Sequence, residues 1–210
     1  MKIKLPNIIP IFPLNGVIFF PETNLPLNIF EPRYLKLIDD CLKKDKFMGM
    51  IQLKRNNSDV YSVGCLGKIT EYKKTKDGRV IINLAGITRF ETKTEINNNK
   101  DYRVFEVAYE KFEVDLEKNK EQSNKIEKIN DLSEKTKVFF KKNGLLLNWK
   151  EFEKLGQNQK INTLAMIAPI SNEEKQTVLE SVNAQSKTKI LSEIIEFYLY
   201  ENSETGLTIQ

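Results

Sequence analysis

Short apolar runs separated by turn residues occupy the first half of the chain and predict β-strands. The dipeptide Asp77-Gly78 stands between two of these runs and favours a tight hairpin turn. Asn97, Asn98 and Asn99 stand between two others and predict a second hairpin. The predicted strands are residues 9–14, 24–30, 46–53, 66–72, 79–85, 87–96 and 102–112. Short strands at this spacing predict a small barrel or sandwich.

Prolines interrupt the first two apolar runs, at Pro10, Pro13 and Pro26. Because proline donates no ladder hydrogen bond, these runs are predicted to be edge strands, strand starts or bulged strands. The spacing changes at Pro32, which suits the first position of a helix. Apolar positions then recur at helical intervals, at Leu35, Ile38 and Leu42.

The second half of the chain has helical spacing throughout. A charged stretch, residues 113–124, marks the change, and Ser171 with Glu174 forms a capping-box pattern. The predicted apolar helix faces are Ile126, Ile129, Leu132, Thr136, Phe139 and Phe140; Ile161, Leu164, Ala165 and Ala168; Val178, Leu179 and Val182; and Ile190, Leu191, Ile194, Ile195 and Tyr198. The sequence therefore predicts an α+β fold, with a β-barrel-like domain over residues 1–114 and a helical domain over residues 115–210.

The composition excludes several classes of chemistry. Of the 210 residues, 40% are hydrophobic and 30% are charged, which is an ordinary balance for a folded protein. Histidine is absent, which excludes Ser-His-Asp and Cys-His catalysis and histidine-ligated metals. Cys41 and Cys65 lie far apart, which fits neither a disulfide framework nor a zinc site.

No targeting segment is predicted. The sequence has no run of about 18 apolar residues, the length expected of a transmembrane helix. Residues 1–14 are basic and then apolar, but three prolines and Asn7 interrupt them, unlike a signal peptide. Together with the cysteine pattern, these features favour a cytoplasmic location.

No catalytic motif stands out. The string at residues 64–70 places Gly64, Gly67 and Lys68 at the wrong spacing for a P-loop, and no dinucleotide-binding or nucleophile-elbow motif occurs. We therefore expect no enzymatic activity, no cofactor and no bound metal.

Several strings, taken in order, resemble one known family; they occupy residues 9–21, 25–42, 47–53, 63–69 and 77–90. Together they resemble the LON substrate-binding domain, the amino-terminal region of the ATP-dependent Lon proteases. The resemblance extends over roughly residues 8–200, and the stretch 164–191 is similar to the helical part of the family. The chain departs from the family at Glu22-Thr23, where glycine is common.

The resemblance implies a fold and a role. The fold would be an amino-terminal β pseudo-barrel, of the type shared with PUA RNA-binding domains, followed by a helical bundle. The role would be to bind exposed apolar segments of unfolded or tagged proteins, or to dock a partner protein. The sequence contains no string that resembles the ATPase or Ser-Lys protease modules, so we expect a non-catalytic binding module.

Two segments are candidates for a groove that holds a peptide or a partner. Phe30, Glu31, Arg33 and Tyr34 stand where a strand gives way to a helix. Aromatic side chains supply contact area, and arginine supplies a forked donor for peptide carboxylates or carbonyls. In the alternative interpretation, the two aromatic side chains fill the core and Glu31 pairs with Arg33 or Arg89.

The second candidate segment contains Val17, Ile18, Phe19 and Phe20. Four bulky residues in a row cannot all face a core in a simple alternating strand, so part of the segment could be exposed to a partner. The alternative is a strand buried on both faces.

Gly86, Arg89 and Phe90 are predicted to be structural. We expect Gly86 to permit a bulge and Phe90 to pack inward. Arg89 is expected to bind a buried carboxylate such as Glu31.

An RNA-binding function is the alternative. Residues 1–114 carry 19 basic and 14 acidic side chains, and Lys73, Lys74, Lys76 and Arg79 cluster at a predicted hairpin tip. The net charge of the whole chain is only +4, however, and no aromatic-rich RNA motif is visible. Nucleic acid is therefore the less favoured partner.

Overall fold

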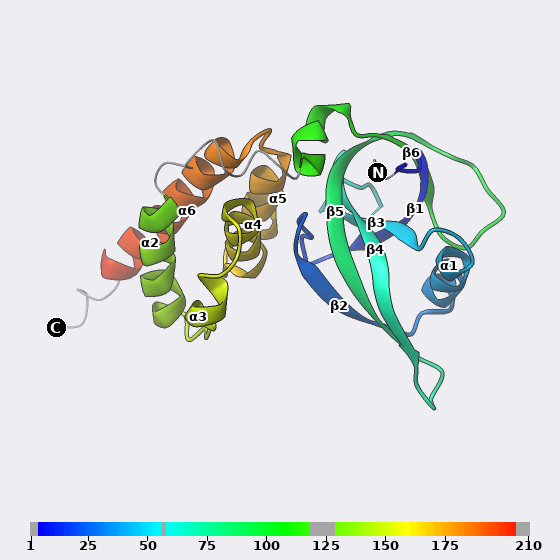
Figure 1. Cartoon of the computed structure of the whole chain (residues 1–210), viewed down its shortest axis with the longest axis horizontal. Coiled ribbons are helices and arrows are strands. Elements are labelled where there is room, and N and C mark those ends of the chain that lie inside the picture. The colour runs from blue at the N-terminus through cyan, green and yellow to red at the C-terminus, as the bar shows by residue number, and fades with distance from the viewer. Residues whose placement is uncertain (1–3, 56–57, 118–128, 205–210) are drawn as a thin grey trace. The chain divides into compact units, whose positions relative to one another are not determined.

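The computed structural model describes residues 4–55, 58–117 and 129–204. Contacts between Cα atoms divide the chain into two units, Met1–Glu117 and Lys118–Gln210. Among the described residues, the first unit contains the strands and the second contains helices without strands, which confirms the predicted α+β class (Figure 1). The predicted boundary, after residue 114, lies just before the end of the first unit.

A six-stranded mixed sheet forms the first unit. Its strands are β1 (Ile8–Leu14), β2 (Asn24–Ile29), β3 (Phe47–Gln52), β4 (Val63–Lys74), β5 (Val80–Glu95) and β6 (Val104–Ala108), and a 3-10 helix η1 (Glu110–Leu116) follows β6. The strand order is β2-β5-β4-β3-β1-β6, and β6 pairs in turn with β5. The pairings therefore close a ring of five strands, with β2 added outside it on β5.

Strand β1 changes partner halfway along, which accommodates its two prolines. Residues 8–10 pair with β6, whereas residues 11–14 pair in parallel with β3. Pro10 lies in the first half and Pro13 in the second, so each has a side without a ladder partner. The predicted edge character is therefore local, because β1 as a whole lies between β3 and β6.

Apolar side chains from five of the strands fill the centre of the ring. They are Ile9, Ile11, Phe47, Ile51, Leu66, Phe90, Phe105 and Val107, all of them buried. Phe90 is completely inaccessible to solvent, which confirms that it packs inward. Burial of this kind is the main source of stability for the unit.

Strand β5 runs without a break through residues that the sequence predicts as two strands. Its register against β4 shifts next to Gly86, which confirms the predicted bulge. The Gly86 amide donates to the carbonyl of Thr23 over 2.9 Å, and its carbonyl accepts from the Glu22 amide over 3.0 Å. A Cβ at position 86 would lie 2.2 Å from the carbonyl oxygen of Phe20. Glycine here allows close approach of two backbones without ending the strand.

The predicted strand over residues 102–112 is too long. Strand β6 ends at Ala108, and the chain turns into η1. This helix buries Phe112 completely, beneath the Arg89 guanidinium at 4.2 Å from the ring centre. The turn into η1 therefore places an aromatic ring against the buried charge of Arg89.

Arg89 binds a buried carboxylate, as predicted, but the predicted partner Glu31 is wrong. The Nε of Arg89 donates to Oδ2 of Asp115 over 2.8 Å, and the Nη2 of Arg89 donates to Oδ1 of Asp115 over 2.8 Å. The two side chains are 1% and 8% exposed. Glu31 lies elsewhere and pairs with Arg33.

Helix α1 (Pro32–Leu42) begins at the predicted proline. Its buried face consists of Tyr34, Leu37, Ile38 and Cys41. The predicted face, centred on Leu35, Ile38 and Leu42, is off by about one position. Tyr34 belongs to the buried face, whereas Leu35 is only half-buried.

The second unit consists of helices α2 (Ile129–Lys142), α3 (Trp149–Phe152), α4 (Gln157–Ile167), α5 (Asn172–Glu180) and α6 (Ala184–Glu204). Helix α6 packs against α2, α4 and α5. The predicted capping box is confirmed at Ser171 and Glu174, which start α5. Val182 was expected on a buried face but is 53% exposed, because α5 ends before it. The predicted position Ile126 lies outside the described residues.

Candidate binding surface

The segment from Phe30 to Tyr34 joins β2 to α1. Phe30 follows the last residue of β2, and 65% of its surface is exposed. Glu31 is the N-cap residue of α1, in extended conformation and without a side-chain capping bond. A large aromatic residue is therefore held in solvent between two regular elements.

Glu31 and Arg33 form an exposed ion pair beside Phe30. The Nε and Nη2 atoms of Arg33 donate to Oε2 of Glu31 over 3.0 Å and 2.8 Å. The side chains of Arg33 and Glu31 are 53% and 42% exposed. Exposed pairs contribute at most about 1 kcal/mol to stability, so either partner can exchange its contact at low cost.

Tyr34 lies beneath this surface and does not form part of it. It is 6% exposed, and its ring centre is 4.2 Å from that of Phe12. Burial raises the pKa of Tyr34, although the positive charge of Arg33 acts in the opposite direction. The Arg33 guanidinium lies 4.6 Å from the centre of the Tyr34 ring. Tyr34 therefore anchors the first turn of α1 and supports Arg33.

The segment from Val17 to Phe20 is buried and irregular. Ile18 and Phe19 are each 2% exposed, and Phe20 is fully inaccessible. Val17 is half-buried. The carbonyl of Phe20 accepts a hydrogen bond from Oγ1 of Thr23 over 2.7 Å, which turns the chain. Since the segment is not a strand, successive side chains need not alternate, and three of them reach the core.

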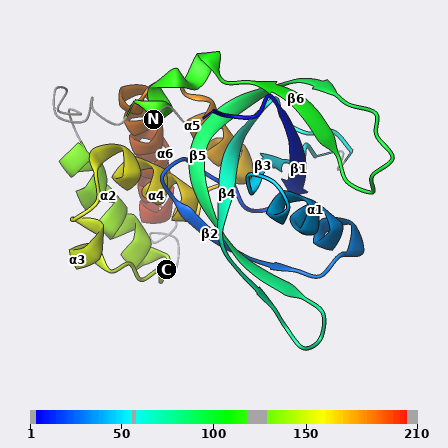
Figure 2. The same ribbon diagram turned by 45° about the vertical axis from the view of Figure 1, so that its right-hand side comes forward.

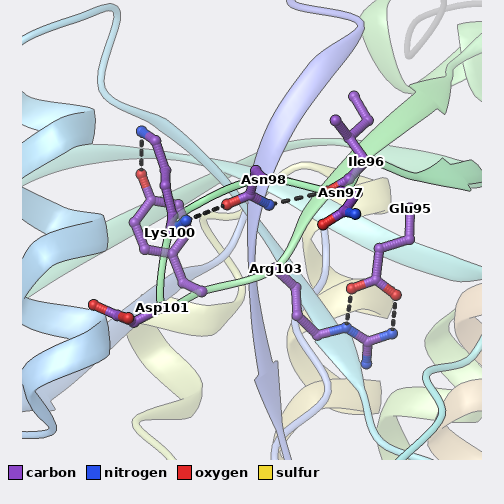
Figure 3. A pocket seen from close by; sticks show the side chains of 8 residues that line it. Glu95, Ile96, Asn97, Asn98, Lys100, Asp101 and Arg103 are labelled. Carbon is purple, nitrogen blue, oxygen red and sulfur yellow. Dashed lines mark hydrogen bonds and ion pairs between the residues drawn. The ribbon is translucent and has the colours of Figure 1, made fainter.

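A pocket of about 420 Å³ lies between β5 and β6, lined by residues 95–98 and 100–103 (Figure 3). Arg103 and Glu95 form a bidentate ion pair at its wall, with N···O distances of 2.7 Å and 2.6 Å. Inside the loop, the Asn98 side chain donates to the carbonyl of Ile96 and accepts from the Lys100 amide. The pocket is polar, and its charged groups have partners within the protein.

Contacts with α1 hold this pocket loop in place. Lys36 donates to Asp101 over 3.1 Å, near the exposed surface of the helix. One turn further along α1, Asp40 accepts from Lys100 over 2.7 Å and from the Tyr102 hydroxyl over 2.6 Å. The hydrogen bond from Lys100, followed by that from Tyr102, lowers the pKa of Asp40 to about 2. The hydrogen bonds to Asp40 and then to Tyr102 in turn raise the pKa of Lys100.

The predicted site residues therefore separate into two groups. Phe30, Glu31 and Arg33 form an exposed cluster at the start of α1, whereas Phe19, Phe20 and Tyr34 are buried. The loop that braces α1 was not predicted as part of a site. In the sequence this loop is marked only by an asparagine-rich turn. Such a turn does not indicate contacts with residues some sixty positions away.

Of the helices in the described parts of the chain, none combines the length and apolarity needed to cross a membrane. The family described as the ATP-dependent protease La (LON) substrate-binding domain matches residues 8–196. The match spans both units.

Curated relatives are Lon proteases. The one from Buchnera aphidicola subsp. Acyrthosiphon pisum is 27% identical over 199 residues, covering 90% of this chain and 25% of that protein. The one from Syntrophus aciditrophicus is 25% identical over 219 residues, covering 99% of this chain and 27% of that protein. The chain thus spans about a quarter of the length of these relatives.

Two solved structures share the fold. A Lon N-terminal domain protein from Xanthomonas campestris superposes with a TM-score of 0.66 at 19% identity, covering 88% of this chain and 96% of that one. The N-terminal domain of Mycobacterium avium complex Lon protease superposes with a TM-score of 0.65 at 14% identity, covering 90% and 98%. The fold described above is therefore that of Lon N-terminal domains.

Proposed function

This chain belongs to the family of the ATP-dependent protease La (LON) substrate-binding domain, and we propose that it recognises protein segments without catalysing their cleavage. The recognised segments are exposed apolar stretches of client or partner proteins. They bind at the cluster of Phe30, Glu31 and Arg33, which we name the α1 entry surface. The observation that carries this proposal is the exposure of Phe30 on a family fold associated with substrate binding.

The α1 entry surface has a rigid base. Ile29 precedes Phe30 and is 3% exposed, and Tyr34 follows it and is 6% exposed. Contact with Phe12 fixes the Tyr34 ring, and the Asp40 contacts fix the other end of α1. An exposed aromatic residue on a fixed base is suited to binding, because little conformational entropy is lost when a partner covers it.

Each exposed residue has a separate task in the proposed complex. Phe30 covers an apolar side chain of the client. The Arg33 guanidinium donates to a client carbonyl or carboxylate, and Glu31 accepts from a client amide. Phe19, Phe20 and Tyr34 act indirectly, since they are buried and hold the surface in place, and half-buried Val17 adds at most a marginal contact.

The expected affinity is modest. Apolar burial contributes about 25 cal/mol per Å², and a short apolar segment binds in roughly the micromolar range after the entropic costs of association. An apolar contact is insensitive to screening, so binding should survive about 0.5 M salt.

A titration with a fluorescently labelled, permanently unfolded model protein tests the proposal. We expect Phe30→Ser to weaken binding by about tenfold, because it removes the apolar anchor. Leu146→Ser is the control, because Leu146 is likewise an exposed apolar residue but lies in the second unit. Equal affinity of wild type and both variants would exclude the α1 entry surface, and no binding by wild type would exclude the function.

A further inference from the structure

The hairpin of β4 and β5 extends beyond the rest of the sheet (Figures 1 and 2). We name residues 70–83 the lysine arm. Strand β2 flanks one side of it only as far as Ile29, which pairs with Val80, so the turn over residues 75–79 lies beyond the last row of the three-stranded region.

The turn of the lysine arm is well defined. Gly78 has a φ of 86°, which confirms the predicted Asp-Gly hairpin. The Thr75 amide donates to the carbonyl of Arg79 over 2.9 Å. Asp77 accepts from the Thr75 hydroxyl and, over 2.7 Å, from Nε of Arg79. The arm therefore presents its side chains on a fixed scaffold.

Three lysines of the arm are exposed and uncompensated. Within the described residues, the ammonium groups of Lys73, Lys74 and Lys76 contact no carboxylate. Glu71 is exposed on the same strand, directly opposite Asn83, and does not pair with them. Arg79 differs, because Asp77 already neutralises it. The arm thus offers three positive charges to an external anion.

The arm also carries exposed apolar surface. Tyr72 is 60% exposed and Ile81 is 44% exposed. In the ladder, Lys73 is opposite Ile81 on one face of the arm. On the other face, Tyr72 lies two positions before Lys74 on the same strand, so each face combines a cation with an apolar group. Such a surface fits a polypeptide that is both acidic and apolar.

The lysine arm adjoins the α1 entry surface. Ile29, Val80 and Lys74 occupy one row across β2, β5 and β4. Neighbouring strands are about 4.8 Å apart, so Lys74 starts about 10 Å from the residue that precedes Phe30. An extended segment covers that distance with about three residues.

We propose that the lysine arm selects client segments in which acidic residues lie a few positions from the apolar anchor. This inference rests on the proposed function and names the class of segment within it. The argument for an acidic protein segment is charge complementarity with the three lysines, together with continuity with the apolar anchor. Complementary charges at the rim of an interface raise the association rate and the specificity more than the final affinity.

The test uses three fluorescently labelled peptides with one apolar core, flanked by Asp, Asn or Lys residues. At low salt, wild type should bind the Asp peptide about fivefold more tightly than the Asn peptide, and the Lys peptide most weakly. Replacing the lysines together, by Lys73→Gln, Lys74→Gln and Lys76→Gln, should make the Asp and Asn peptides equal. The matched control replaces three exposed lysines of the second unit, by Lys141→Gln, Lys142→Gln and Lys150→Gln, and should preserve the preference.

The outcomes separate the arm from the function. If the Asp and Asn peptides bind wild type equally, the lysine arm has no selective role but the proposed function stands. If no peptide binds, both proposals fail. If a single-stranded RNA oligonucleotide binds more tightly than the Asp peptide and the arm variant loses it, the arm is a nucleic-acid contact and the inference is overturned.

Discussion

Two short segments of the first unit each contain an arginine and a phenylalanine, and they behave in opposite ways. Residues 86–90 place Arg89 and Phe90 in the core, where Arg89 meets Asp115 at 1% and 8% side-chain exposure. Residues 30–34 place Phe30 and Arg33 in solvent, where Arg33 meets Glu31 at 53% and 42%. An arginine, a phenylalanine and a carboxylate thus form a structural brace in one place and an accessible surface in the other.

Burial accounts for the difference. A buried guanidinium has lost its hydration, so its partner is indispensable. An exposed guanidinium keeps its hydration, so its partner can be replaced by a ligand. The comparison therefore predicts that neutralising a carboxylate costs less stability when that carboxylate is more exposed.

The largest effect is expected from Asp115→Asn. The substitution keeps the shape of the side chain but leaves the buried Arg89 without its countercharge, which should cost about 3–5 kcal/mol. Urea denaturation measures the loss. Asp77→Asn is the control, because its pair with Arg79 is about half exposed and should change stability far less. Similar losses in the two variants would contradict the role of burial.

Gly86→Ala should have the next largest effect. The added Cβ would lie 2.2 Å from the Phe20 carbonyl oxygen, so the backbone must shift. Overpacking of this kind costs about 2–3 kcal/mol. Gly16→Ala has open space around its Cβ and only the cost of a φ of 89°, about 1 kcal/mol. Thermal unfolding should rank the two in this order, and the reverse order would refute the close approach.

The exposure of the Asp40 side chain, 29%, lies between that of Asp115 and that of Glu31. Hydrogen bonds from Lys100 and then Tyr102 lower the pKa of Asp40 from 3.8 to about 2 in the folded state. Its contribution is therefore complete above about pH 4 and is lost as the pH falls toward 2, and screening reduces it to about 1 kcal/mol. Asp40→Asn should reduce the change in stability between about pH 2 and pH 4. Asp39→Asn is the control and should leave that change as it is in wild type. An unchanged slope would contradict the bracing of α1 by the pocket loop.

Glu31→Gln should also have a small effect, below about 0.5 kcal/mol, because the pair is exposed. Urea denaturation under the conditions used for Asp115→Asn gives a direct comparison. A loss of several kcal/mol would show that residues 30–34 are a structural brace, which would weaken their assignment as a binding surface.

Local features of the fold could be predicted from the sequence because their signals are local. Pro32 starts α1, the Asp77-Gly78 turn joins β4 to β5, and the Ser171 cap starts α5. Each depends on backbone conformation and on bonds between residues a few positions apart. The strand-then-helix order follows from the change in periodicity.

Pairings over long sequence distances could not be predicted. Arg89 was correctly expected to need a carboxylate, but charge alone does not distinguish Glu31 from Asp115. The bracing of Asp40 by Lys100 joins residues sixty positions apart, and no pattern in the sequence announces it.

The candidate site was predicted only in part, for a related reason. Phe19, Phe20 and Phe30 have the same side chain and each follows an apolar residue, yet only Phe30 is exposed. The irregular backbone before β2, fixed by Thr23 and the close approach to Gly86, turns the first two inward. Periodicity describes regular elements, so it has no prediction for such a segment.

Photo-crosslinking from position 30 tests the central claim most directly. A benzoylphenylalanine placed there keeps the aromatic ring and reports what lies against it. The account predicts crosslinks to an unfolded model protein from position 30 and none from a matched probe at the exposed position 146. Equal crosslinking from both positions, or none from position 30 while the unfolded protein still binds, would contradict recognition through the α1 entry surface.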